Sequence, residues 1–192
     1  SGLVGSEMCI RDRTYAAAVG TLEEWKAEVG VHVARNPYML VTVLAGLTAL
    51  LYQAFDLPKL VLMLVGPSSQ GKTTLLRVGQ SLINSGKNIE TFAGTTKGIE
   101  TKLREHSDAP VFMDELRQAD VPSDLVLIVF NTENGANRKV SSGAQKVVQR
   151  GPIRSTLVVA NESTIAEITS GTRVKVNEGF GARLLELHLS LI

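Results

Sequence analysis

Short apolar runs alternate with amphipathic stretches along most of this chain. The run over residues 60–65 is apolar throughout, which is typical of a strand buried on both faces of a parallel sheet. Further strands are predicted over residues 89–92, 110–113, 155–160 and 183–189, and helices over 72–83, 98–106 and within 123–130. This alternation predicts a three-layer α/β fold with a mostly parallel sheet.

Two helices are predicted in front of this sheet. Thr21 and Glu24 have the spacing of a capping box at the start of the first helix, and Asn36-Pro37 separates the first helix from the second. Residues 37–55 carry no charge, but polar and small residues interrupt the apolar pattern. We therefore expect this stretch to form a helix buried against the sheet and no membrane span. Together the two helices make up an N-terminal helical segment over residues 14–57.

The first thirteen residues have a different character. Residues 6–13 read Ser-Glu-Met-Cys-Ile-Arg-Asp-Arg, which resembles the conceptual translation of a transposon adapter used in sequencing libraries. We expect residues 1–13 to be an artefact, and the core over residues 58–192 to be truncated at its C-terminus. The single cysteine, Cys9, excludes an internal disulfide, as is typical of a cytoplasmic protein.

A phosphate-binding loop joins the first strand to the next helix. Residues 66–73 read Gly-Pro-Ser-Ser-Gln-Gly-Lys-Thr, the P-loop (Walker A) pattern in its strand-loop-helix context. Backbone N–H groups of such a loop bind phosphates, Lys72 bridges the β- and γ-phosphates, and the Thr73 hydroxyl binds Mg²⁺. The predicted ATP-binding residues are Gly66, Pro67, Ser68, Ser69, Gln70, Gly71, Lys72, Thr73 and Thr74.

Two acids follow the strand at residues 110–113. Asp114 and Glu115 stand where ligands collect in open α/β sheets, which predicts a Walker B element. Asp114 would hold Mg²⁺ and Glu115 would polarise the attacking water. The alternative is a solvated strand end.

Two further polar residues flank predicted strands. Asn161 ends the strand at 155–160, where it would lie between the Walker A and Walker B strands and orient the attacking water as a sensor 1 residue. Its alternative is a helix cap or turn residue. Arg183 opens the last strand and would reach a γ-phosphate in its own or a neighbouring subunit, or else form a structural salt bridge.

Positive charge is concentrated in one segment. The whole chain has a net charge of only +1, so no global field attracts nucleic acid. Between residues 134 and 161 there are five basic residues and no acid, and residues 139–148 have the pattern of a hairpin. This position resembles that of the pre-sensor-1 hairpin of AAA+ ATPases and superfamily 3 helicases, which implies nucleic-acid binding by Arg138, Lys139, Lys146 and Arg150. A solvated loop, or arginines that contact a neighbour's nucleotide, are the alternatives.

Taken together, these motifs resemble a known family. From about Trp25 to Leu189 the chain is similar to the helicase-like ATPases catalogued as domain of unknown function 927. The elements that carry the likeness are residues 66–74, Thr95-Thr96 with 98–100, residues 113–116, Asn134-Gly135 with Arg138, the strand from Ser155, and residues 181–183. Many members have Ser-Thr-Gly-Glu where this chain has Val-Ala-Asn-Glu162. The resemblance implies a ring-forming homo-oligomer, such as a hexamer.

The leading hypothesis is a Mg²⁺-dependent ATPase that acts as a helicase-like motor on DNA, with single-stranded DNA as its partner, in phage or plasmid replication. An ATP-dependent switch or scaffold that moves no strand is the second hypothesis. A small-molecule kinase is the third, and it would need a lid and an acceptor pocket that the sequence does not show.

Overall fold

The computed structural model describes residues 19–55, 57, 59–83, 89–91, 96–106, 108–114, 153–170 and 184–190. Within these ranges five strands form one sheet in the order β2-β3-β4-β1-β5, and every neighbouring pair is parallel. The strands are β1 (Val61–Val65), β2 (Glu90–Thr91), β3 (Val111–Asp114), β4 (Leu157–Asn161) and β5 (Leu184–His188). The predicted parallel α/β sheet is confirmed, and β4 separates β1 from β3.

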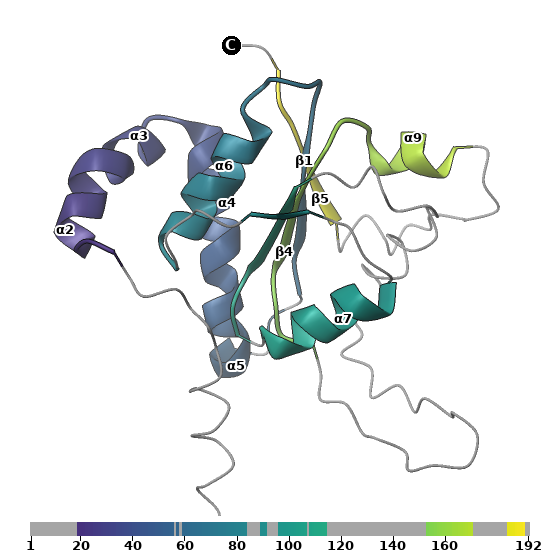
Figure 1. Cartoon of the computed structure of the whole chain (residues 1–192), viewed down its shortest axis with the longest axis horizontal. Coiled ribbons are helices and arrows are strands. Elements are labelled where there is room, and N and C mark those ends of the chain that lie inside the picture. Colours follow the sequence, from purple (N-terminus) through teal and green to yellow (C-terminus); the bar gives the residue numbers. More distant parts are fainter. Residues whose placement is uncertain are drawn as a thin grey trace, which may run out of the picture.

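Helices cover both faces of the sheet, as Figure 1 shows. One face carries α4 (Pro37–Thr48) and α6 (Lys72–Ser81), and the other carries α7 (Thr96–Glu105) and α9 (Ile165–Thr169). The helix predicted at 72–83 ends at Ser81, and the strand predicted at 89–92 is only two residues long. The three-layer prediction is confirmed. The helix predicted within 123–130 and the hairpin at 139–148 lie outside the described residues.

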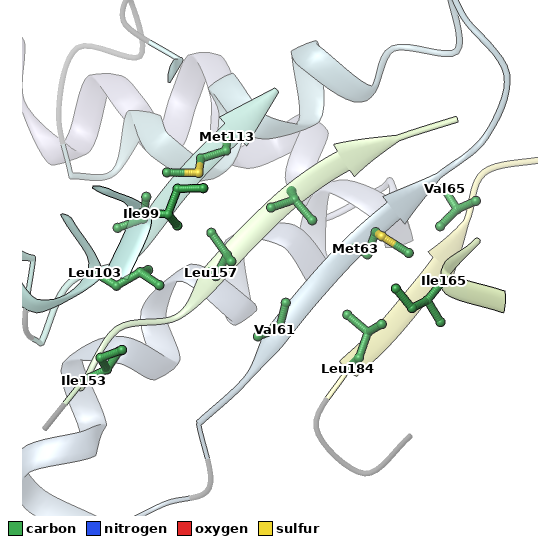
Figure 2. Close-up of a cluster of buried hydrophobic side chains, with 12 residues drawn as sticks. Val61, Met63, Val65, Ile99, Leu103, Met113, Ile153, Leu157, Ile165 and Leu184 are labelled. Carbon is green, nitrogen blue, oxygen red and sulfur yellow. The ribbon is translucent and has the colours of Figure 1, made fainter. Parts of the chain in front are cut away.

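Strand β1 is buried on both faces, which explains its uninterrupted apolar sequence. Val61, Met63 and Val65 pack with residues of α7 and α9 in the cluster drawn in Figure 2. Leu62 and Leu64 point to the opposite face, where α4 and α6 pack. All five side chains are at most 4% exposed. Burial of this strand contributes about 1.5–3 kcal/mol per large aliphatic side chain.

Each N-terminal helix begins at a residue whose side chain caps it. The Thr21 hydroxyl accepts a hydrogen bond from the Glu24 N–H, and Glu24 accepts one from the Thr21 N–H, so the predicted capping box starts α2 (Leu22–Trp25). A π-helical turn η1 (Lys26–Gly30) and α3 (Val31–Val33) continue this helix. Asn36 then caps α4 by accepting from the N–H groups of Tyr38 and Met39.

Helix α4 continues through a 3₁₀ turn η2 (Ala49–Leu51) into α5 (Tyr52–Phe55). The expectation of a buried helix here is only half correct, because the sheet lies on one side of α4. Thr42 and Ala45 are buried, whereas Leu44 is 52% and Phe55 65% exposed. In the part of the chain that the structure describes, no helix combines the length and the apolarity needed to cross a bilayer.

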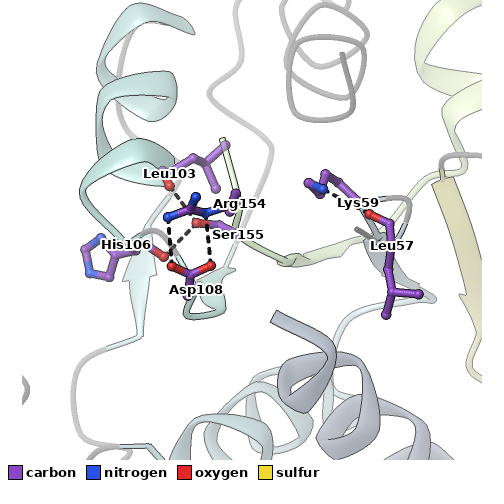
Figure 3. A network of polar contacts seen from close by, with 7 residues as sticks. All are labelled: Leu57, Lys59, Leu103, His106, Asp108, Arg154 and Ser155. Carbon is purple, nitrogen blue, oxygen red and sulfur yellow. Dashed lines mark hydrogen bonds and ion pairs between the residues drawn. The ribbon is translucent and has the colours of Figure 1, made fainter. Parts of the chain in front are cut away.

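Hydrogen bonds and an ion pair connect the segments before β3 and β4 with each other and with the end of α7, as drawn in Figure 3. The Arg154 guanidinium contacts both carboxylate oxygens of Asp108, with distances of 3.0 and 3.1 Å. The Ser155 hydroxyl lies within hydrogen-bond distance of the backbone carbonyls of Leu103 and His106. Arg154 is thus the one member of the basic segment that the structure describes, and it is paired with an acid.

Candidate functional site

The carboxyl ends of β1, β3 and β4 meet at one edge of the sheet, where ligands bind in α/β folds of this kind. A cavity of about 260 Å³ opens there. Its lining consists of Ser68, Ser69, Gly71, Lys72, Thr73, Thr74, Asp114, Ala160, Asn161 and Glu162. Six of the predicted ATP-binding residues and two predicted strand-end residues are therefore brought to one cavity.

The loop after β1 turns through two left-handed residues, Ser69 (φ 65°) and Gly71 (φ 77°). Helix α6 begins immediately afterwards at Lys72, and no side chain caps its first turn. The first N–H groups of a helix have no partner within the helix, and the helix dipole favours negative charge at this end. The beginning of α6 therefore suits a phosphate group.

Neighbouring residues approach Gly66 closely. A Cβ atom on Gly66 would lie 2.7 Å from Gln70 Oε1 and 3.2 Å from Leu189 Cβ and from the Leu189 carbonyl oxygen. The Gly66 N–H also donates a 3.2 Å hydrogen bond to the carbonyl oxygen of Asn161. The loop is thus held between the ends of β4 and β5.

Lys72 folds back over this loop. Its Nζ donates hydrogen bonds to the carbonyl oxygens of Gly66 (2.6 Å) and Pro67 (2.7 Å). An ammonium group is thereby placed next to the loop, where it would meet the charge of a polyphosphate.

Thr73 and Asp114 are in direct contact although 41 positions separate them. The Thr73 hydroxyl donates a hydrogen bond of 2.6 Å to Asp114 Oδ2, across the space between α6 and β3. Both side chains carry hard oxygen atoms, which are the ligands that Mg²⁺ prefers. The two residues that the sequence assigns to Mg²⁺ therefore meet, and their chemistry fits that ion.

Asn161 lies between the P-loop strand and the strand of Asp114, as predicted. It ends β4, is 8% exposed, and donates from Nδ2 to the carbonyl oxygen of Ser163 (2.7 Å). The alternative of a helix cap is wrong, because Thr164 caps α9 and accepts from the Glu167 N–H. The hydrogen bond to Ser163 is that of a turn residue, and the sensor role stays a prediction.

Glu162 is a cavity residue that the sequence analysis did not assign. It directly follows Asn161 at the end of an apolar strand. The same signal, an acid immediately after a buried strand, identifies Asp114 and would have identified Glu162 as well.

Six predicted site residues lie outside the described part of the chain. They are Glu115, Arg183, Arg138, Lys139, Lys146 and Arg150. Glu115 directly follows β3 and Arg183 directly precedes β5 in the sequence. Their assignments stay predictions.

No curated protein matches the sequence. The solved structure of SCCmec type IV Cch, described as an active helicase, is similar over 88% of this chain and 31% of its own, with 17% identity and a TM-score of 0.67. A structure of the JCV helicase with a bound acetamide ligand covers 86% of this chain and 49% of its own at 13% identity, and its TM-score of 0.35 carries no argument.

At 17% identity the likeness to Cch concerns the fold, which is helicase-like, and this chain spans about a third of the length of that structure. A family model matches residues 5–150, three quarters of the chain. The chain therefore belongs to the family described as Domain of unknown function (DUF927).

Proposed function

We propose that this chain binds ATP with Mg²⁺ at the carboxyl edge of the sheet and hydrolyses it. The contact between Thr73 and Asp114 carries the proposal. It joins the first turn of α6, where a phosphate would bind, to the end of β3, where an acid would hold the metal. A Gly-rich turn alone would not require an acid at this point.

The described residues have separate tasks in this proposal. Lys72 and the N–H groups at the start of α6 bind the phosphate oxygens. To do so, the Lys72 ammonium group leaves the carbonyl oxygens of Gly66 and Pro67, to which it donates in the structure. Thr73 and Asp114 would hold Mg²⁺, which when bound neutralises the charge on the phosphates.

Hydrolysis also needs an activated water. We assign its deprotonation to Glu115, its orientation to Asn161, and stabilisation of the developing charge on the γ-phosphate to Arg183. Asn161 lines the cavity, which supports its part in the assignment.

We further propose that ATP hydrolysis drives a homo-oligomeric motor on single-stranded DNA, in phage or plasmid replication. The helicase-like fold supports this proposal, as does the excess of basic residues between 134 and 161. Arg154 is engaged by Asp108, so the DNA contacts are assigned to Arg138, Lys139, Lys146 and Arg150.

The test is steady-state ATP hydrolysis by the whole chain, with and without single-stranded DNA. We expect Lys72→Ala and Glu115→Gln to abolish turnover, and DNA to stimulate the wild type. Replacing Lys139 and Lys146 by Ala should weaken stimulation, while neutralising Lys26 and the exposed Arg35 on the N-terminal helices should not. Turnover that ignores DNA, or binding without turnover, would contradict the motor and favour an ATP-dependent switch or scaffold.

A further inference from the structure

The side chains of β3 and β4 alternate between the two faces of the sheet. Phe112 on β3, and Val158 and Ala160 on β4, pack on the face that carries α6. Val111, Met113, Leu157 and Val159 pack on the opposite face, with α7 and α9. A period of two therefore places Asp114 on the α6 face and Asn161 on the other face. Glu162 follows the last residue of β4, at a bend.

The pairing of β3 with β4 brings the carboxyl ends of both strands to the same cavity. Met113 is paired with Val159, so the next step along both strands sets Asp114 beside Ala160. Glu162 lies two residues beyond Ala160, and both acids line the cavity. Glu162 is exposed where the strand ends.

The charges of the cavity favour a cation at this place. The described lining contains two carboxylates, Asp114 and Glu162, and one lysine, Lys72. A polyphosphate that enters beside two carboxylates is repelled unless a divalent ion lies between them. Mg²⁺ keeps several of its waters in protein sites, and a nearby carboxylate can bind it through one of these waters.

We propose that Glu162 is a second carboxylate of the metal end of this site, which holds Mg²⁺ through a bound water while Asp114 and Thr73 hold it more closely. The inference rests on the proposed ATP site and adds a residue to it. Glu162 is a positioning residue here, distinct from Glu115, to which we assign the proton of the attacking water.

The experiment measures metal binding separately from turnover. A fluorescent ATP analogue is bound to the whole chain while Mg²⁺ is titrated, and Mn²⁺ binding to the protein–nucleotide complex is followed by electron paramagnetic resonance. We expect Glu162→Gln to raise the half-saturating Mg²⁺ and Mn²⁺ concentrations about tenfold or more. Binding of the analogue in EDTA should change less than about twofold, because the substitution leaves the P-loop intact.

Glu105→Gln is the matched control. Glu105 is an exposed glutamate at the end of α7, and the chain after it leads to the amino end of β3, away from the cavity. It should leave both titrations unchanged.

Different results would separate failure of the inference from failure of the proposed function. A wild type without Mg²⁺-dependent nucleotide binding would contradict the proposed function. A wild type with such binding, combined with unchanged titrations in Glu162→Gln, would overturn the inference alone. Loss of turnover in Glu162→Gln with unchanged metal binding would also overturn it, because Glu162 would then act on the reacting water.

Discussion

The Thr73 hydroxyl donates a 2.6 Å hydrogen bond to Asp114, and this contact joins the first turn of α6 to the end of β3. Both groups are partly buried. A short hydrogen bond to a carboxylate is stronger than one between neutral groups, so it holds the two oxygen atoms in place before any metal binds.

Replacement of Thr73 by Val should remove the hydroxyl while keeping the shape of the side chain. We expect Mg²⁺-dependent ATP hydrolysis to fall about 100-fold, because one oxygen ligand and the bond that orients Asp114 are both lost. Thr73→Ser keeps the hydroxyl and should retain most of the activity. Equal activity of the two variants would contradict a ligand role for this hydroxyl.

Asp114→Asn should separate metal binding from folding. The asparagine carbonyl oxygen can still accept from Thr73, so the free energy of unfolding should change by less than about 1 kcal/mol. The negative charge is lost, and the affinity for Mg²⁺ in the presence of nucleotide should fall about 10- to 100-fold. Urea unfolding and a Mg²⁺ titration measure the two quantities, and a large loss of stability without a change in metal affinity would assign Asp114 a structural role.

Gly79→Ala should destabilise the contact between α6 and β3. A Cβ at Gly79 would lie 2.6 and 2.9 Å from ring atoms of Phe112, so the ring or the helix must move, at a cost of about 1–3 kcal/mol. Gly30→Ala is the control, and it should raise the free energy of unfolding. Its Cβ would meet Trp25 at an ordinary 3.4 Å, and alanine favours helix over glycine by about 1 kcal/mol. Urea unfolding measures both, and Phe112→Leu should relieve the clash in the double variant.

Ser81→Ala should loosen the N-terminal helix from α6. The indole Nε1 of Trp25 donates a 2.8 Å hydrogen bond to the Ser81 hydroxyl, at the opposite end of α6 from Lys72. Loss of this bond should cost about 1 kcal/mol. Trp25 is the only tryptophan of the chain, so a red shift of its fluorescence would report the change directly.

Ser81→Thr is the companion variant, because it keeps the hydroxyl. Its emission and stability should match the wild type. The prediction would be wrong if Ser81→Ala left the emission unchanged, since the indole would then not depend on this hydrogen bond for its position.

The loop and its flanking elements follow from the sequence alone, because their causes are local. A glycine at a left-handed position, a helix that starts with Lys72, and an apolar run with no polar alternation specify the strand, the turn and the helix without reference to distant residues. The caps at Thr21 and Asn36 are local in the same way; the Thr21 cap was predicted, whereas Asn36-Pro37 was predicted only as the boundary between two helices.

Which side chains share the site depends on how distant segments pack together. Thr73 meets Asp114 because β4 lies between β1 and β3 and aligns their carboxyl ends, and strand order depends on packing between distant segments. Glu162 shares the cavity with Asp114 because β4 ends beside β3 and the chain bends directly after the strand. A single sequence shows that an acid follows a strand, but the face and the neighbours of that acid depend on how the strands pair.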